Sequence, residues 1–99
     1  VEAIFCSSDL LALGVMTEAR ARGLTVPDDM AVMGFGDVPF VADMVPALTT
    51  VRINGEKIGT LAAHYLINRA EEREIQSRIV DVGFSIIQRD STSLAKTLR

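Results

Sequence analysis

The sequence has few of the residues that build disulfides, metal centres and many catalytic sites. Its 99 residues include one cysteine, one histidine and no tryptophan. With Cys6 alone, the chain can form neither an internal disulfide nor a cysteine-based metal site, and this usage fits a reducing compartment. His64 has no metal-ligand residue four positions away on either side, so we expect neither metal binding nor general-base catalysis there. No cofactor is predicted.

Long apolar runs and a strong charge of either sign are also missing. No apolar stretch approaches the roughly 20 residues that cross a membrane, so we expect no membrane partner. The net charge is −3 with ten scattered basic residues, which argues against nucleic-acid binding by this segment alone, because duplex binding depends on clustered Lys and Arg. No signal peptide is visible, but the chain starts at Val1 inside an expected strand, so we expect part of a longer protein, and the missing signal peptide says little about where that protein is located.

The first third of the sequence predicts a strand–helix–strand unit. Apolar residues make up 48% of the chain and charged residues 23%, as in globular domains. Ala3–Cys6 and Met30–Phe35 are short apolar runs of the kind found in parallel strands covered on both faces. Between them, residues 10–22 have helical character, and Gly23 stands where a left-handed residue ends a helix. The fold class is therefore α/β, with parallel strands.

Polar residues follow both of these predicted strands. Ser8 and Asp9 come after the first strand, and Gly36 and Asp37 come after the second. Neighbouring parallel strands end at the same edge of a sheet, where ligands bind in α/β folds. Asp9 is a candidate acceptor for ligand hydroxyl groups, or else a helix-capping or first-turn acid. Asp37 is a second candidate, or else a loop acid bonded to its own backbone.

The remaining chain predicts two more strands and a second helix. Residues 48–52 form a short β-branched strand, and Asn54 can cap a helix at residues 56–71 that carries one apolar stripe. Residues 79–87 alternate between apolar and polar types, which predicts a half-buried strand at the edge of the sheet. The apolar face of that strand is expected to hold Val80, Val82, Phe84 and Ile86.

The first half of the first helix has no polar face. Every residue from Leu10 to Met16 is apolar or glycine. A helix that covers one side of a sheet needs only an apolar stripe. We therefore expect a second covered surface, of which a subunit interface is one form.

Several stretches in this order resemble the LacI/GalR family of bacterial transcription regulators. They are Ala3-Ile-Phe-Cys-Ser-Ser-Asp-Leu-Leu-Ala-Leu-Gly14, Gly23-Leu-Thr-Val-Pro-Asp-Asp-Met-Ala-Val-Met-Gly-Phe35, Pro46-Ala-Leu-Thr-Thr-Val51, Ile58-Gly59 and Arg89-Asp-Ser-Thr92. The segments Gly34-Phe-Gly-Asp37 and Arg52-Ile-Asn-Gly55 are similar to gluconate-utilisation repressors.

The resemblance implies a periplasmic-binding-protein-like fold with two Rossmann-like lobes that clamp a small molecule. Residues 1–92 would be the C-terminal part of the effector-binding and dimerisation domain, and residues 93–99 a frayed tail. The DNA-binding domain would precede Val1. Residues up to about 51 and from 84 to 92 would belong to one lobe, and the helix at 56–71 would complete the other.

The same resemblance implies roles for individual residues. Ser8 takes a position that often contacts the effector, and Asn54 lies in a segment that reaches the cleft, although a plain helix cap is the competing interpretation. Many family members carry Asp where this chain has Gly36, and in this chain the acid, Asp37, stands one place later. The implied dimer interface contains Leu10, Leu13, Thr17, Met44 and Val45.

Three functions are compatible with the residues and the resemblance. The first is a regulator segment that binds a sugar or sugar acid, forms homodimers and controls operator binding by the missing domain. The alternative is the C-terminal piece of a periplasmic sugar-binding transport protein. An enzyme comes third, because Ser7 and Ser8 have no evident His–Asp partners and no nucleophile–base pair is visible.

Overall fold

The computed structural model describes residues 2–72 and 79–93. Its elements are β1 (Ala3–Phe5), α1 (Asp9–Ala21), β2 (Ala31–Phe35), the 3₁₀ turn η1 (Val41–Asp43), β3 (Thr49–Arg52), α2 (Gly55–Ala70), β4 (Ser85–Ile87) and the 3₁₀ turn η2 (Asp90–Thr92). The chain divides into two compact units, one comprising the chain up to Arg52 and from Ser85 onward, the other comprising Ile53–Phe84. This boundary lies close to the lobe division that the family resemblance implies.

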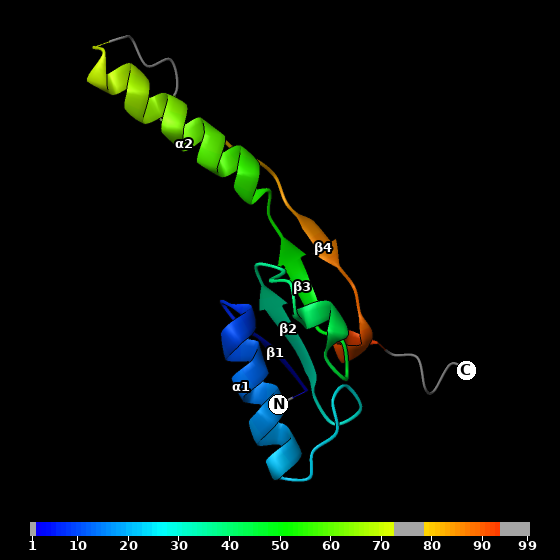
Figure 1. The fold of residues 1–99 in the computed structure, drawn as a ribbon. Helices are drawn as coiled ribbons and strands as arrows, with labels where there is room; N and C mark the ends of the chain where they lie inside the picture. Colours follow the sequence, from blue (N-terminus) through cyan, green and yellow to red (C-terminus); the bar gives the residue numbers. More distant parts are fainter. Residues whose placement is uncertain (1, 73–78, 94–99) are drawn as a thin grey trace. The chain divides into compact units, whose positions relative to one another are not determined.

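The first unit is a four-stranded sheet with α1 packed against β2 (Figure 1). The strand order is β1-β2-β3-β4; the first three strands are parallel and β4 runs antiparallel to β3 at the edge. The predicted strand–helix–strand unit is thereby confirmed. Ser8 begins α1, where its Oγ accepts a hydrogen bond from the Leu11 backbone N–H at 3.1 Å. Gly23, with φ of 76°, follows the helix end as predicted.

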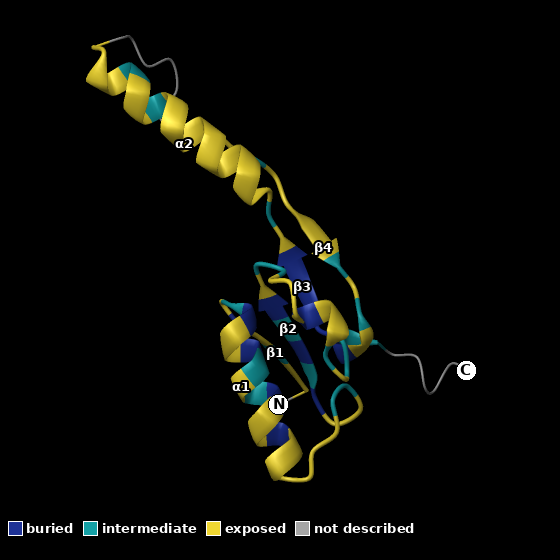
Figure 2. Cartoon of the chain, in the orientation of Figure 1, coloured by how far each residue is buried: buried dark blue, intermediate teal, exposed yellow. Residues whose placement is uncertain are grey.

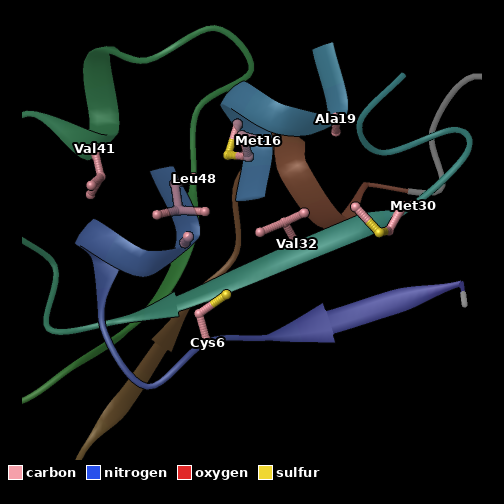
Figure 3. Packing of buried hydrophobic residues seen from close by; sticks show 8 residues of the cluster. Cys6, Met16, Ala19, Met30, Val32, Val41 and Leu48 are labelled. Atoms are coloured by element: carbon pink, nitrogen blue, oxygen red, sulfur yellow. The ribbon is translucent and has the colours of Figure 1, made fainter. Parts of the chain in front are cut away.

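The core lies between α1, β2 and the segment that leads into β3. Its buried apolar residues, most of which Figure 3 labels, are Cys6, Ala12, Met16, Ala19, Met30, Val32, Val41 and Leu48. Burial raises the pKa of the Cys6 thiol above its ordinary value, which keeps it a neutral packing group. The buried residues of α1, which are Asp9, Ala12, Met16 and Ala19, recur at the spacing that places them on one face of a helix.

On the opposite face of the sheet, the described residues leave parts of β1 and β2 uncovered. Phe5 is 64% exposed and Phe35 is 38% exposed. The prediction that both strands are covered on both faces is therefore wrong for this chain. The reason is that α1 is the only helix longer than a single 3₁₀ turn among the described residues of the first unit, and it covers one face only.

Buried hydrogen bonds tie η2 to the middle of the sheet. Ser91 is fully buried, and its Oγ donates to the Val32 carbonyl at 2.6 Å while accepting from the Thr49 N–H at 2.8 Å. The Thr49 hydroxyl accepts from the Arg89 N–H at 2.8 Å. Because these bonds fix the chain on both sides of Arg89, they also set the direction of its side chain.

The second unit has no buried residue in α2, as the exposed colouring of that helix in Figure 2 shows. Ile58 and Leu61, on the predicted apolar stripe, are 40% and 37% exposed. A helix needs a packed apolar face for most of its stability in a protein. The described part of this chain does not provide a surface that covers the α2 stripe.

The predicted strand at residues 79–87 is much shorter in the structure. Only Ser85–Ile87 are in a strand, and Val80, Phe84 and Ile86 are 53%, 70% and 61% exposed. Ser85 pairs with Arg52, the last residue of β3, so no ladder partner exists for the residues before Ser85. The prediction of a half-buried apolar face is therefore wrong for this chain. The predicted position of this strand at the sheet edge is confirmed.

No helix among the described residues is long and apolar enough to cross a membrane. Of the predicted tail, the structure describes Ser93, and residues 94–99 lie outside the described residues.

Candidate functional site

The carboxylate of Asp9 joins the ends of three strands. It accepts hydrogen bonds from the Val38 N–H at 2.8 Å and from the Thr50 hydroxyl at 2.7 Å. Asp9 begins α1 directly after β1, Val38 follows β2, and Thr50 lies in β3. The predicted meeting of the Ser8–Asp9 and Gly36–Asp37 segments at one edge of the sheet is confirmed. We call the group Ser8, Asp9, Asp37, Thr50 and Arg52 the rim.

Asp9 is 1% exposed, and each of its two carboxylate oxygens already has a donor from the protein. The capping role that the sequence left open for Asp9 belongs to its neighbour Ser8. Asp9 therefore connects the start of α1 to the segment after β2 and to β3. A direct contact between Asp9 and a ligand stays a prediction.

Gly34 makes room for this carboxylate. A Cβ added at Gly34 would collide with Asp9 Oδ1, and it would lie 3.0 Å from Leu48 Cδ2 and 3.2 Å from Asp9 Cα. Distances of this size are shorter than ordinary van der Waals contacts between carbon atoms. The position must be glycine for Asp9 to reach Thr50 and Val38.

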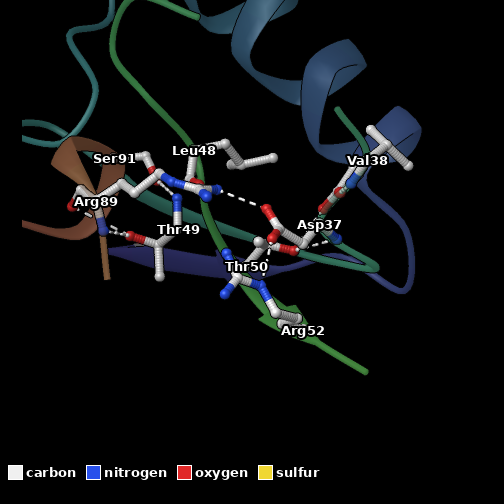
Figure 4. A network of polar contacts seen from close by, with 9 residues as sticks. Asp37, Val38, Leu48, Thr49, Thr50, Arg52, Arg89 and Ser91 are labelled. Carbon is white, nitrogen blue, oxygen red and sulfur yellow. Dashed lines mark hydrogen bonds and ion pairs between the residues drawn. The ribbon is translucent and has the colours of Figure 1, made fainter. Parts of the chain in front are cut away.

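Asp37 holds two arginine side chains, one on each carboxylate oxygen (Figure 4). Arg52 Nε lies 2.7 Å from Oδ2, and one terminal nitrogen of Arg89 lies 2.9 Å from Oδ1 and 3.0 Å from the Leu48 carbonyl. Asp37 has a φ of 54°, in the left-handed region that Asp tolerates better than most residues. Gly36 before it, with φ of 122°, allows the sharp turn out of β2.

The sequence prediction missed both arginines. Arg52 ends β3, whose carboxyl end shares an edge with β2, so its nearness to Asp37 follows from the parallel topology once that is known. Arg89 follows an antiparallel edge strand, and nothing in the local sequence indicates that this strand returns beside Asp37.

Lowering the pH is expected to weaken the ion pairs of Asp37 with Arg52 and Arg89. Burial on its own raises the pKa of Asp37, but hydrogen bonds and charges from Arg52 and Arg89 outweigh it and hold the pKa below 3.8. The unfolded chain binds this proton more readily than the folded chain. The stabilisation from Asp37 is thus fully present above about pH 4, and it is lost as the pH falls through the lower folded pKa. Chemical denaturation between pH 2.5 and 6 should show a smaller loss toward acid in Asp37→Asn than in the unmodified protein; equal slopes would contradict this assignment.

The other predicted ligand contacts lie in different units. Ser8 is half-buried at the start of α1. Asn54 belongs to the second unit, where its Oδ1 caps α2 by accepting from the Lys57 N–H at 3.0 Å. The capping interpretation of Asn54 is confirmed, and its contact with a ligand stays a prediction.

A groove of about 480 Å³ runs along the second half of α1. Its walls include Leu13, Thr17, Met44 and Val45, four of the five residues predicted for a dimer interface. The fifth, Leu10, is 70% exposed on α1, and Val45 is 84% exposed. The groove and the rim are both in the first unit.

No group of three or more metal-ligand side chains occurs in the part of the chain that the structure describes.

Comparison with known families assigns the chain to one of them. Residues 2–92 match the family described as the periplasmic binding protein-like domain. The chain belongs to that family. The HTH-type transcriptional regulator GntR of Pseudomonas aeruginosa is 38% identical over 92 residues, which cover 93% of this chain and 27% of the relative. The HTH-type transcriptional repressor PurR of Vibrio cholerae is 33% identical over 89 residues, covering 90% of this chain and 26% of the repressor.

Solved structures of relatives agree with this assignment. A LacI-type transcription regulator from Bifidobacterium animalis subsp. lactis superposes with a TM-score of 0.83 at 35% identity, covering 94% of this chain and 33% of the regulator. A LacI family transcriptional regulator from Lactobacillus casei, solved with bound sucrose, gives a TM-score of 0.75 at 33% identity, covering 91% of this chain and 33% of the regulator.

The resemblance to the LacI/GalR family and the expected fold are confirmed. The relatives named above are transcriptional regulators and not enzymes, which favours the regulator over the transport protein. This periplasmic binding protein-like chain spans about a quarter of the length of the curated relatives it matches.

Proposed function

We propose that this chain is the effector-binding and dimerisation segment of a cytoplasmic LacI-type transcriptional regulator. The complete protein would bind operator DNA through a domain outside this chain and would have no catalytic activity. A sugar or sugar acid would act as effector, by binding one arrangement of the two lobes more tightly than the other. Since the coupling between effector and operator is reciprocal, the effector changes operator affinity and the operator changes effector affinity by the same factor.

The observation that carries this proposal is the rim, in which polar groups converge at the carboxyl ends of parallel strands. The Ser8 Oγ accepts from Leu11 and keeps its own hydrogen available for a ligand. Asp37 and Asn54 would contribute further polar contacts, and Asp9 would hold the rim in shape or accept a ligand hydroxyl directly. The bound sucrose in the Lactobacillus casei regulator supports a hydroxyl-rich effector.

The test is a thermal-shift screen of sugars and sugar acids on the complete protein, followed by operator binding with and without the best compound. We expect at least one compound to raise the unfolding temperature and to change operator affinity. The Ser8→Gly variant should reduce the shift, because glycine is tolerated at a helix N-cap but offers no hydroxyl. Failure of every sugar and sugar acid to bind would overturn the proposed effector class.

We also propose that the groove along α1 is covered by a second copy of the chain. Leu10, Leu13 and Thr17 are on α1, and Met44 and Val45 come from the loop that faces it across the groove. Exposed apolar surface of this kind, rimmed by polar residues, is typical of protein interfaces. The apolar character of the whole first half of α1 is consistent with a covered outer surface.

Val45→Lys is expected to weaken the proposed dimer by about 10-fold or more, because a buried unpaired charge is costly at an interface. The matched control is Ala42→Lys, an exposed position in η1 outside the groove. Sedimentation equilibrium of the complete protein measures the dissociation constant of both variants. Equal dimerisation by Val45→Lys and the unmodified protein would contradict the assignment of this groove.

A further inference from the structure

Two arginine side chains meet at the rim, where they pair with Asp37. The guanidinium groups of Arg52 and Arg89 share the carboxylate of Asp37. The second carboxylate of the rim, that of Asp9, is 1% exposed and bonded to Val38 and Thr50. Both carboxylates of the rim are therefore largely covered, and the charge that solvent reaches at this edge is positive, in a chain whose net charge is −3.

The two arginines differ in exposure and in hydrogen bonding. The Arg89 side chain is 15% exposed, and its terminal nitrogen bonds both Asp37 and the Leu48 carbonyl. The Arg52 side chain is 55% exposed and meets Asp37 through Nε. Among the described residues, no hydrogen-bond partner is seen for the two terminal nitrogens of Arg52. The exposed positive charge of the rim is thus that of Arg52.

Asp37 also fixes the direction in which Arg52 presents this charge. Its carboxylate holds Nε at 2.7 Å, and Arg89 holds the other oxygen of the same carboxylate. The Asp37 backbone is fixed in turn, because its N–H faces the Thr50 hydroxyl at 3.3 Å, which bonds the buried Asp9. A side chain held in its binding orientation loses less entropy when a ligand arrives.

We propose that Arg52 binds the carboxylate of a monoanionic sugar acid. The inference rests on the proposed function and narrows its effector class. A planar guanidinium with free terminal nitrogens can donate two parallel hydrogen bonds to the two oxygens of a carboxylate. The single exposed guanidinium matches a monoanion, whereas a phosphate at neutral pH carries about one and a half to two negative charges. Ser8, at the same edge, remains available for the hydroxyl groups of such a ligand.

Isothermal titration of the complete protein tests this inference with matched pairs of ligands. Gluconate is compared with glucose, galacturonate with galactose, and glucose 6-phosphate serves as the phosphate probe. We expect one of the two acids to bind at least about 10-fold more tightly than its neutral counterpart and than glucose 6-phosphate. Arg52→Gln should remove this preference, so that each acid binds no more tightly than its neutral counterpart, and Arg52→Lys should keep part of it.

Arg22→Gln is the control, because Arg22 is an exposed arginine on α1 that pairs with Glu18 away from the rim. Unfolding temperatures of all variants without ligand show that each is folded. Tighter binding of neutral sugars or of the phosphate than of the acids would overturn the inference and leave the proposed function standing. An unchanged acid preference in Arg52→Gln would do the same. Binding of none of the five compounds would count against this effector class.

Discussion

Asp9→Ala is expected to lower the free energy of unfolding by about 3 to 5 kcal/mol, because it removes a charge-assisted acceptor from two donors at once. Asp9 is 1% exposed and Thr50 is fully buried. Loss of the carboxylate leaves the Thr50 hydroxyl and the Val38 N–H without the partner that each has at 2.7 to 2.8 Å. Urea denaturation of the complete protein measures the effect.

Two further variants separate this structural role from ligand binding. Asp43→Ala removes an exposed acid in η1 and should change stability by no more than about 0.5 kcal/mol. Asp9→Asn keeps one acceptor oxygen and should fall between the two. If Asp9→Ala proved as mild as Asp43→Ala while abolishing effector binding, Asp9 would be a ligand contact rather than the connection between strand ends.

Gly34→Ala is expected to destabilise the protein by about 1 to 3 kcal/mol through overpacking. The added methyl group would collide with Asp9 Oδ1 and would crowd Leu48 Cδ2 at 3.0 Å. The strand has little room to move, because Gly34 pairs with Thr50 in the middle of the sheet. The measurement is the shift of the denaturation midpoint at constant slope.

Gly14→Ala is the matched control for this substitution. Gly14 lies in α1 with nothing within 4 Å of an added Cβ, so alanine there should be neutral or should stabilise by up to about 1 kcal/mol. The cost of Gly34→Ala should also shrink when Asp9 is already alanine, because the colliding oxygen is then absent. If Gly34→Ala destabilised the Asp9→Ala variant as much as the unmodified protein, the collision with Asp9 would not be the cause of the destabilisation.

The local features of the fold could be predicted because short-range rules govern them. Apolar runs marked β1 and β2, and the helical character of residues 10–22 marked α1. An apolar stripe marked α2, and Gly23 and Asn54 marked a helix end and a helix start. All of these lie within two residues of the observed positions. The shared edge of Ser8–Asp9 and Gly36–Asp37 followed from the parallel arrangement alone. None of these inferences needed information about distant parts of the chain.

The predictions failed for residues whose burial needs a covering surface that the described residues do not supply. They also failed for side-chain contacts that depend on pairing between distant segments. Phe5 and Phe84 look like core residues in the sequence, yet they are 64% and 70% exposed because the surfaces that would cover them are not in the described residues. Arg89 escaped prediction because its contact with Asp37 spans 52 positions and depends on the antiparallel return of β4. Helical and strand periodicities do not predict contacts between residues so far apart in the sequence.

Hydrogen–deuterium exchange of the complete protein, with and without its best-binding sugar or sugar acid, tests most directly whether the rim is the ligand site. Amides in two segments, residues 8–12 at the start of α1 and residues 36–38 after β2, should exchange more slowly with the ligand bound. Residues 18–25, at the far end of α1, should not be slowed by contact with the ligand. Protection that left both rim segments unchanged would contradict the proposed site.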